Sequence, residues 1–393
     1  MNIKVIGIGA AGNKAAIKAV TEKVLSDNDI LLMNTANQDI PVNFRNRSLM
    51  FGNTAGCGGC GKERSRSQGF ISSLIENGDS LQKSINQLCS PGDLVVIVAS
   101  TEGGTGSGAA PILAAYISDV IGVRPQLIGF TGTEDDLRGI QNTLGFFKDC
   151  AEYCSNCTVQ LISNKKFMSE VNNNKLKAEE LANEDFVKRI KVLQGSILRE
   201  SSQNIDPMDH MKIVTTNGYM SISSISTNES IESVEQFNDL CDKMIKQSKS
   251  LTTGSNRCLR LGVILNISED DKESIDWNFS VIKNRFAEIG EVFLHVQTSL
   301  DETRQIIIIE CGMEMPIKFV TATYEKLKSK MANSAKETNF ASAMKGIDTS
   351  SSMLDFDNAM SLNNNISSSA FLNKLKKKND DTDVKKDDGL SKY

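Results

Sequence analysis

A glycine-rich segment at 101–111, TEGGTGSGAAP, contains the residues best suited to bind phosphate groups. It directly follows the apolar run LVVIVA at 94–99, and a helical pattern begins near Ala109. Glycines in such a loop leave backbone N–H groups free to donate, and hydroxyl side chains add further donors. The segment therefore predicts a cradle for the α- and β-phosphates of a nucleotide. The residues expected to form it are Gly103, Gly104, Thr105, Gly106, Ser107 and Gly108.

A second glycine motif, GIGAAG at 7–12, follows another strand-like run and has the spacing G-x-G-x-x-G. A dinucleotide-binding dehydrogenase is one alternative, but its next strand should end in an acidic residue, and ILLMN ends in Asn34. A second alternative is a phosphate-binding P-loop at 56–63. There the residue after the glycine and lysine is Glu63, where a magnesium-binding Ser or Thr is required. Both alternatives therefore lack a residue that their chemistry needs.

The sequence contains nine cysteines, four of them in two C-x-x-C pairs. Cys57 with Cys60, and Cys154 with Cys157, have the spacing of zinc ligands. The first pair lies among glycines, whereas a zinc site requires a compact and rigid scaffold. We expect reduced thiols and no metal held by protein ligands alone, which agrees with a reducing compartment.

The elements that must position these loops alternate between short apolar runs and helical patterns, the latter at 65–89 and 109–121. Continuous apolar runs of this length are typical of buried parallel strands. The predicted strands are 3–8, 30–34, 94–99, 126–131 and 158–162. Such an α/β sheet places its ligand crevice at the carboxyl ends of the strands, where the glycine-rich segments fall.

The remaining chain predicts a long amphipathic helix at 175–202 and then a smaller α/β unit. Its predicted elements are strands at 212–225, 259–267, 291–297 and 305–312 and helices at 230–247 and 274–289. Pro316 opens a helix to about Lys345, after which Ser, Asn, Asp and Lys predict a disordered tail. The expected organisation is a nucleotide-binding domain at 1–174, a connecting helix at 175–203, a second domain at 204–315, a C-terminal helix at 316–345 and the tail at 346–393.

Acidic residues outnumber Lys and Arg, 49 to 44, for a net charge of −5. This excludes whole-surface attraction to nucleic acid or to an anionic membrane. No apolar run approaches the length of a membrane span, and no secretory signal is recognisable, so we expect a cytoplasmic protein with no membrane partner.

These motifs together resemble the tubulin/FtsZ superfamily, whose signature GGGTG[ST]G is similar to 102–108. The resemblance extends in order over 1–320. Segment 5–13 is similar to the family's first nucleotide loop, Asn34 begins the second and 55–64 the third. Ser163-Asn164-Lys165-Lys166 resembles the sugar-contacting segment. The resemblance implies further nucleotide contacts from Gly9, Ala10, Ala11, Asn13, Asn34, Gly56, Gly58, Gly59, Glu134, Arg138, Asn164 and either Asn183 or Asp185.

The chain departs from the family pattern at three places. Glu102 replaces the first signature glycine, Ala36 stands where FtsZ has Asp, and the loop at 131–141 aligns poorly. The ligands of a Mg²⁺ ion carried by the nucleotide are therefore left open.

The resemblance implies GTP hydrolysis to GDP at a contact between subunits. NIDPMD at 204–209 is similar to the synergy loop, in which Asn204, Asp206 and Asp209 would act on the nucleotide of the next subunit. The expected product is a head-to-tail homopolymer. The alternative for the two aspartates is simple capping of a helix N-terminus.

No proline follows Pro316, unlike the partner-recruiting end of FtsZ, so the chain resembles more the TubZ group that segregates plasmid or phage DNA. A DNA-bound adaptor protein is expected to bind the tail, with direct DNA binding weak or absent because aspartates offset its lysines. The alternatives are an FtsZ-like division polymer and a monomeric metabolic GTPase.

Overall fold

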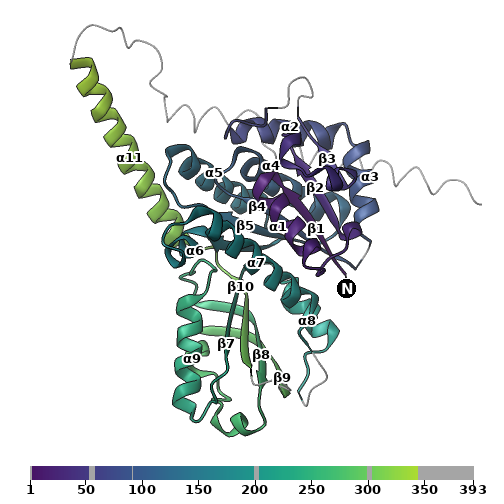
Figure 1. Cartoon of the computed structure of the whole chain (residues 1–393), viewed down its shortest axis with the longest axis vertical. Helices are drawn as coiled ribbons and strands as arrows, with labels where there is room; N and C mark the ends of the chain where they lie inside the picture. The colour runs from purple at the N-terminus through teal and green to yellow at the C-terminus, as the bar shows by residue number, and fades with distance from the viewer. Residues whose placement is uncertain (1, 53–57, 91, 199–202, 299–302, 344–393) are drawn as a thin grey trace, which may run out of the picture.

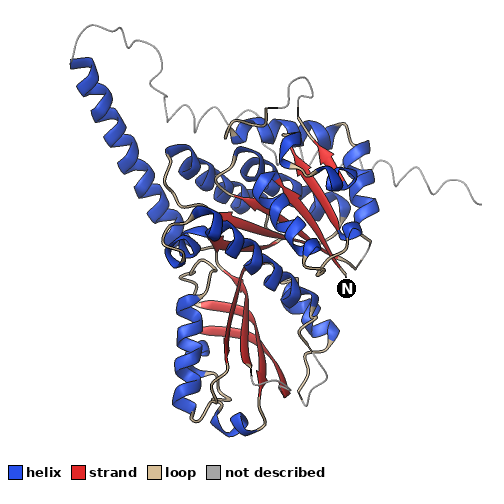
Figure 2. Ribbon diagram, in the orientation of Figure 1, coloured by secondary structure: helices blue, strands red, loops and turns tan. Residues whose placement is uncertain are grey.

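The structure, a computed structural model, describes residues 2–52, 58–90, 92–198, 203–298 and 303–343. Its described strands form one sheet in the order β3-β2-β1-β4-β5-β6-β7-β10-β8-β9 (Figure 2). The strands are β1 (Ile3–Ile8), β2 (Ile30–Asn34), β3 (Ser48–Met50), β4 (Leu94–Ser100), β5 (Pro125–Thr131), β6 (Thr158–Ser163), β7 (Gly218–Thr227), β8 (Arg257–Ile267), β9 (Glu288–Thr298) and β10 (Arg304–Met313).

The first six strands run parallel and are covered by helices on both faces, as their continuous apolar sequences predict. Ile6 and Ile8 of β1 pack into the cluster under α2, α3, α4 and α5, while Ile3 and Val5 face α1 and α7. The helices are α1 (Gly9–Thr21), α2 (Arg64–Glu76), α3 (Asp79–Leu88), α4 (Gly104–Tyr116), α5 (Leu137–Tyr153), α6 (Asn164–Glu170) and α7 (Lys175–Gln194). The parallel α/β domain is therefore confirmed.

The second half continues the same sheet through a narrow joint. β6 and β7 pair at only two positions, Thr158 with Gly218 and Val159 with Tyr219. Beyond this joint β10 lies antiparallel between β7 and β8, and β9 lies parallel to β8. Helix α8 (Pro207–Val214) packs on one face and α9 (Val234–Gln247) on the other. Figure 1 shows this part below the first, with α7 crossing between them.

Three predicted helices have different bounds. The pattern at 65–89 is two helices, because Gly78 adopts a φ of +63° between α2 and α3. The long helix predicted at 175–202 ends at Gln194, eight residues early, because Gly195 takes the left-handed C-cap conformation. The helix expected at 274–289 is wrong: only Ser280–Lys283 (α10) is α-helical, and β9 has begun by Glu288.

Helix α8 also replaces the first residues of a strand expected from 212. Asp206 accepts a hydrogen bond from the Asp209 N–H as the N-cap, and Pro207 occupies the first turn. Both features favour a helix start, since proline there loses no hydrogen bond. The strand therefore begins only at Gly218.

The predicted C-terminal helix is present as α11 (Ile317–Ala343). Its first turns pack on α5, where the Phe319 and Phe147 rings lie 5.7 Å apart, and it then extends away from the body (Figure 1). The predicted tail at 346–393 lies outside the described residues. Among the helices that the structure describes, none combines the length and apolar character needed to cross a bilayer.

Candidate functional site

Two helices begin at the carboxyl ends of neighbouring parallel strands and point their N-termini at the same space. α1 starts at Gly9 after β1, and α4 starts at Gly104 after β4. A Cβ atom on Gly9, whose φ is +73°, would lie 3.3 Å from the backbone nitrogen of Gly106. The free N–H groups and positive dipole ends of both helices therefore converge, which is the arrangement that binds phosphate.

A cavity of about 350 Å³ opens in front of these two N-termini. Its floor includes a hydrogen bond between the hydroxyls of Thr35 and Thr105, whose oxygens are 2.8 Å apart. The predicted residues that line it are Gly9, Ala10, Ala11, Asn34, Gly58, Gly59, Gly103, Gly104, Thr105 and Gly106. Four segments far apart in the sequence thus meet at one cavity.

The glycine-rich segment forms the first turn of α4. The helix therefore begins at Gly104, before the start near Ala109 that the sequence predicts. A Cβ atom on Gly104 would lie 2.8 Å from the backbone of Lys62 and Glu63, and one on Gly106 would lie 3.0 Å from the Ser100 carbonyl oxygen. Glycine is required at these positions because the backbone of other loops lies too close to the helix for a side chain. The glycines also leave the N–H groups of the helix accessible to a ligand.

Two residues of this segment have structural positions in place of the predicted phosphate contacts. The Ser107 hydroxyl donates to the Gly103 carbonyl, and neither Ser107 nor Gly108 lines the cavity. A Cβ atom on Gly108 would lie 2.2 Å from the Ser67 hydroxyl, so Gly108 allows α4 to pack on α2. Both residues shape the helix that presents the cradle.

A second cavity of about 290 Å³ adjoins the first, and Ser100 and Gly103 line both. Asn164 and Asn183 lie in its wall, as predicted for the sugar and base ends of a nucleotide. The Asn164 Oδ1 is buried with no hydrogen-bond partner among the described residues. A buried acceptor of this kind needs a donor from a ligand or water. Together the cavities are of a size typical for a small-molecule site.

Asp185, the alternative to Asn183, lines neither of these cavities. Its carboxylate accepts a hydrogen bond of 2.7 Å from the Arg189 guanidinium, and both residues line a separate cavity with Lys249. On the helix α7, Asn183 is therefore the residue that faces the site.

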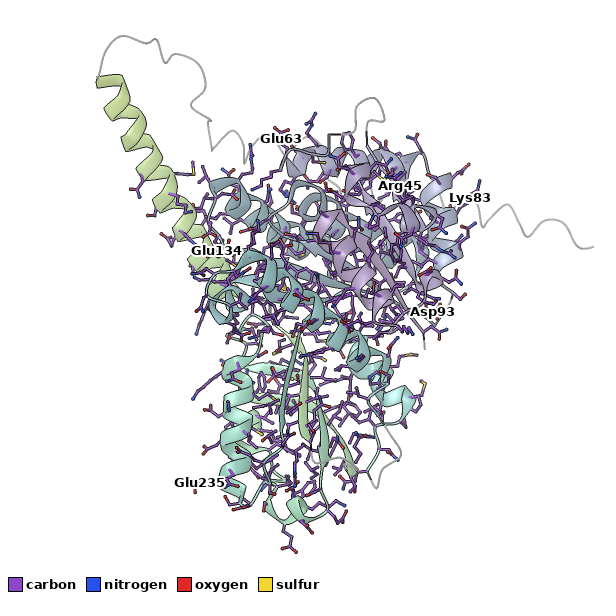
Figure 3. All side chains as sticks on the ribbon, in the orientation of Figure 1. Arg45, Glu63, Lys83, Asp93, Glu134 and Glu235 are labelled. Atoms are coloured by element: carbon purple, nitrogen blue, oxygen red, sulfur yellow. The ribbon has the colours of Figure 1, made fainter. Side chains whose placement is uncertain are left out.

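Glu134 and Arg138 also lie outside both cavities, which corrects their predicted place at the nucleotide. The two carboxylate oxygens of Glu134 accept hydrogen bonds from Thr323, at 2.7 Å, and Lys326, at 3.1 Å, both on α11. Figure 3 shows Glu134 beside that helix. Arg138 is exposed on the first turn of α5.

Asn13 and Gly56 complete the predicted set. Asn13 is fully buried and lines neither cavity; its side-chain amide donates to the Met33 carbonyl, and its Oδ1 has no hydrogen-bond partner among the described residues. Gly56 lies outside the described residues.

Asp39 is a cavity residue that the sequence reasoning missed. It lies on the cavity wall and accepts a hydrogen bond of 3.2 Å from the Asn34 side chain, while position 36 holds alanine. The signal was available as the only acidic residue in the segment 34–44. Its carboxylate lies beside the phosphate cradle, where the donor set of a magnesium–nucleotide complex needs an oxygen ligand.

The predicted catalytic residues lie at the opposite end of α7 from these cavities (Figure 1). The first turns of α7 line the second cavity, whereas its last turn holds α8 through a 3.0 Å hydrogen bond between His210 and the Val192 carbonyl. With 20 residues, α7 is about 30 Å long. Asn204, Asp206 and Asp209 therefore do not reach the cavities of their own subunit.

The fold and the site define a class of protein: a parallel α/β domain with two helix N-termini arranged as for a phosphorylated ligand, joined by a long helix to a second unit. Residues 2–172 match the Tubulin/FtsZ family, GTPase domain. That part of the chain is therefore similar to a GTPase domain.

The similarity to individual relatives extends over both halves. The cell division protein FtsZ 2 of Pyrococcus furiosus is 24% identical over 333 residues, which cover 80% of this chain and 77% of that protein. A GTPγS-form protofilament of TubZ from Bacillus thuringiensis serovar israelensis matches with a TM-score of 0.69 at 16% identity over 88% of this chain and 95% of that one. CetZ2 from Haloferax volcanii, as a GTPγS-bound protofilament, gives 0.65 at 17% identity over 84% and 100%. These structures share the fold.

Proposed function

We propose that the protein binds GTP across the two cavities and hydrolyses it at a head-to-tail contact between subunits of a filament. The observation that carries the proposal is the separation of the nucleotide cavities from the carboxylates of α8 by the length of α7. One subunit has the cradle at one end and the acidic turn at the other, so that a second copy is needed to complete the site.

The cavities suit the parts of the nucleotide in order. The helix N-termini of α1 and α4 would hold the phosphates, and the second cavity would take the sugar and guanine. Asp39 is the carboxylate available to a Mg²⁺ ion that arrives with the nucleotide, and such an ion would neutralise phosphate charge.

Hydrolysis requires a group that orients the attacking water. We assign this role to Asp209, because Asp206 is the cap of α8, whereas the carboxylate of Asp209 is engaged in an exposed ion pair, and such pairs are weak. Asp209 is partly exposed, and its carboxylate lies 2.9 Å from the ammonium group of Lys212 on the same helix. The exposed Met208 between them offers apolar surface for a neighbouring subunit. The TubZ and CetZ2 structures, described as protofilaments, support assembly of this kind.

Specific GTPase activity should therefore rise with protein concentration. Below the concentration at which light scattering begins, we expect GTP to bind without appreciable phosphate release; above it, release per subunit should increase and then level off. Parallel measurements of phosphate and scattering over a dilution series test this. A specific activity that is constant across the series would identify a monomeric GTPase and contradict the proposal.

For the biological role we favour segregation or positioning of plasmid or phage DNA in the cytoplasm, through an adaptor bound to the tail. The basis is the tail sequence, with its apolar-basic cluster FLNKLKKK at 371–378 and no proline. An FtsZ-like division polymer is the alternative, and the sequence similarity to an archaeal FtsZ favours it.

Removal of the tail separates its role from assembly. A chain ending at Lys345 should still form GTP-dependent filaments, because the described cavities and α8 lie upstream. The same chain should lose retention of its plasmid or phage DNA in cells, measured as loss per generation. Failure of the shortened chain to scatter light with GTP would mean that the tail is a filament contact.

A further inference from the structure

Glu102 lies in the wall of the second cavity, next to residues shared by both cavities, at a position where the family signature has glycine. It follows Ser100 by two residues and directly precedes Gly103, and both of these neighbours line both cavities. Glu102 itself lines the second cavity. The sugar of a nucleotide connects its phosphates to its base, so it must pass this junction.

The carboxylate of Glu102 is held in a space that two glycines leave open. A Cβ atom on Gly132 would lie 1.5 Å from the Glu102 carboxyl carbon, and one on Gly139 would lie 3.2 Å from it. The Glu134 backbone N–H donates to Glu102 Oε1 at 2.8 Å, and the Asn142 side chain donates to the Glu102 carbonyl at 2.9 Å. Both the backbone and the side chain of Glu102 are thus positioned before any ligand binds.

Glu134, whose backbone N–H holds the Glu102 carboxylate, is itself fixed by contacts with α11. Glu134 has a φ of +60°, an uncommon conformation for a residue with a side chain, and its carboxylate is bound by Thr323 and Lys326. Tertiary contacts therefore hold the Glu102 carboxylate in one position, whereas an unrestrained surface side chain would rotate among several.

The chemistry of the ligand group follows from the charge. A carboxylate repels phosphate, and Asp135 and Asp136 near Glu102 strengthen that repulsion. Partial burial raises the pKa of Glu102, so its charge is best compensated by hydrogen-bond donors. The sugar hydroxyls are the donors of a nucleotide closest to its phosphates.

We propose that Glu102 accepts a hydrogen bond from a ribose hydroxyl of the bound nucleotide and selects ribonucleotides over their deoxy forms. The inference rests on the proposed function, since it requires GTP in these cavities. It assigns a contact with the sugar to Glu102, which replaces a signature glycine, in addition to the sugar-contacting segment expected at Asn164.

The test compares three nucleotides, GTP, 2′-deoxy-GTP and 3′-deoxy-GTP, binding to the full chain below its assembly concentration. The wild type should bind GTP about ten- to a hundredfold more tightly than at least one deoxy form, as expected for a hydrogen bond to a charged group. In E102Q and E102A the affinity for GTP should fall toward that of the same deoxy form, whose own affinity should change little. E235Q alters an exposed carboxylate in the first turn of α9, outside both cavities, and should retain the discrimination.

Equal weakening of all three nucleotides by both Glu102 variants would show that Glu102 only braces the loop, and would overturn the proposal. So would a wild type that binds the three equally, or loss of discrimination in E235Q but not in E102Q. Absence of GTP binding by the wild type would instead overturn the proposed function, and with it this inference.

Discussion

Replacement of Gly104 by valine is expected to abolish tight GTP binding, with the Kd raised about a hundredfold or more. A side chain at this position meets the backbone of Lys62 and Glu63 at 2.8 Å, so the loop that closes the first cavity must move or α4 must tilt. Overpacking of this kind costs about 3 kcal/mol, which corresponds to a factor of about a hundred in affinity. Titration of GTP into dilute protein, followed by calorimetry, measures the change.

Gly69→Val is the matched control for Gly104→Val. Gly69 is exposed in α2, where a Cβ atom would meet no atom within 4 Å. Both variants place valine in a helix, but only Gly104→Val should lose GTP while retaining the circular dichroism of the wild type. Full GTP affinity in a folded Gly104→Val protein would show that the phosphates do not bind at the N-terminus of α4.

The exchange of Asp209 for asparagine should leave GTP binding intact and slow hydrolysis by a factor of about 10² to 10⁴, the range of a general base or water-orienting group. The residue lies far from the cavities of its own subunit, so binding to a single chain does not depend on it. Filaments of Asp209→Asn should assemble and then persist, because GTP is not consumed. Phosphate release and light scattering, recorded together over time, show both effects.

Two further variants locate the effect of Asp209→Asn. Asp242→Asn changes an exposed aspartate that pairs with a lysine one turn away on α9, and it should hydrolyse GTP at the wild-type rate. Asp206→Asn retains a side-chain acceptor for the cap of α8, whereas Asp206→Ala should lose about 1 kcal/mol of stability. If Asp209→Asn is fully active and Asp206→Asn is not, the catalytic assignment moves to Asp206.

The sheet and the phosphate cradle could be read from local sequence because each depends on neighbouring residues. Five predicted apolar runs correspond to buried parallel strands. A strand covered by helices on both faces has apolar residues at successive positions, whereas a half-exposed strand alternates apolar and polar residues. The glycines before α4 indicated an anion site, since a helix start with no side chains in the way leaves its N–H groups free. Asp206 followed by proline likewise marks a helix start.

Other features were set by contacts between segments that are distant in the sequence. Glu134 binds α11 across 189 positions, and no local pattern could have moved it from the nucleotide to that helix. The need for glycine at 104 and 108 comes from α2 and the loop before it pressing on α4. The expected helix at 274–289 failed because its amphipathic pattern was interrupted by Phe279, which has a φ of +52° and packs into the core of the second half.

The division of the site between two ends of the molecule is also a tertiary property. The motifs for the cradle and the acidic turn are each visible in the sequence, but their distance is not, since residues far apart along a chain often fold together. Here α7 keeps them apart, because the length of a helix is set by its rise per residue. Because α7 separates them, the phosphate cradle and the acidic turn lie at opposite ends of one subunit.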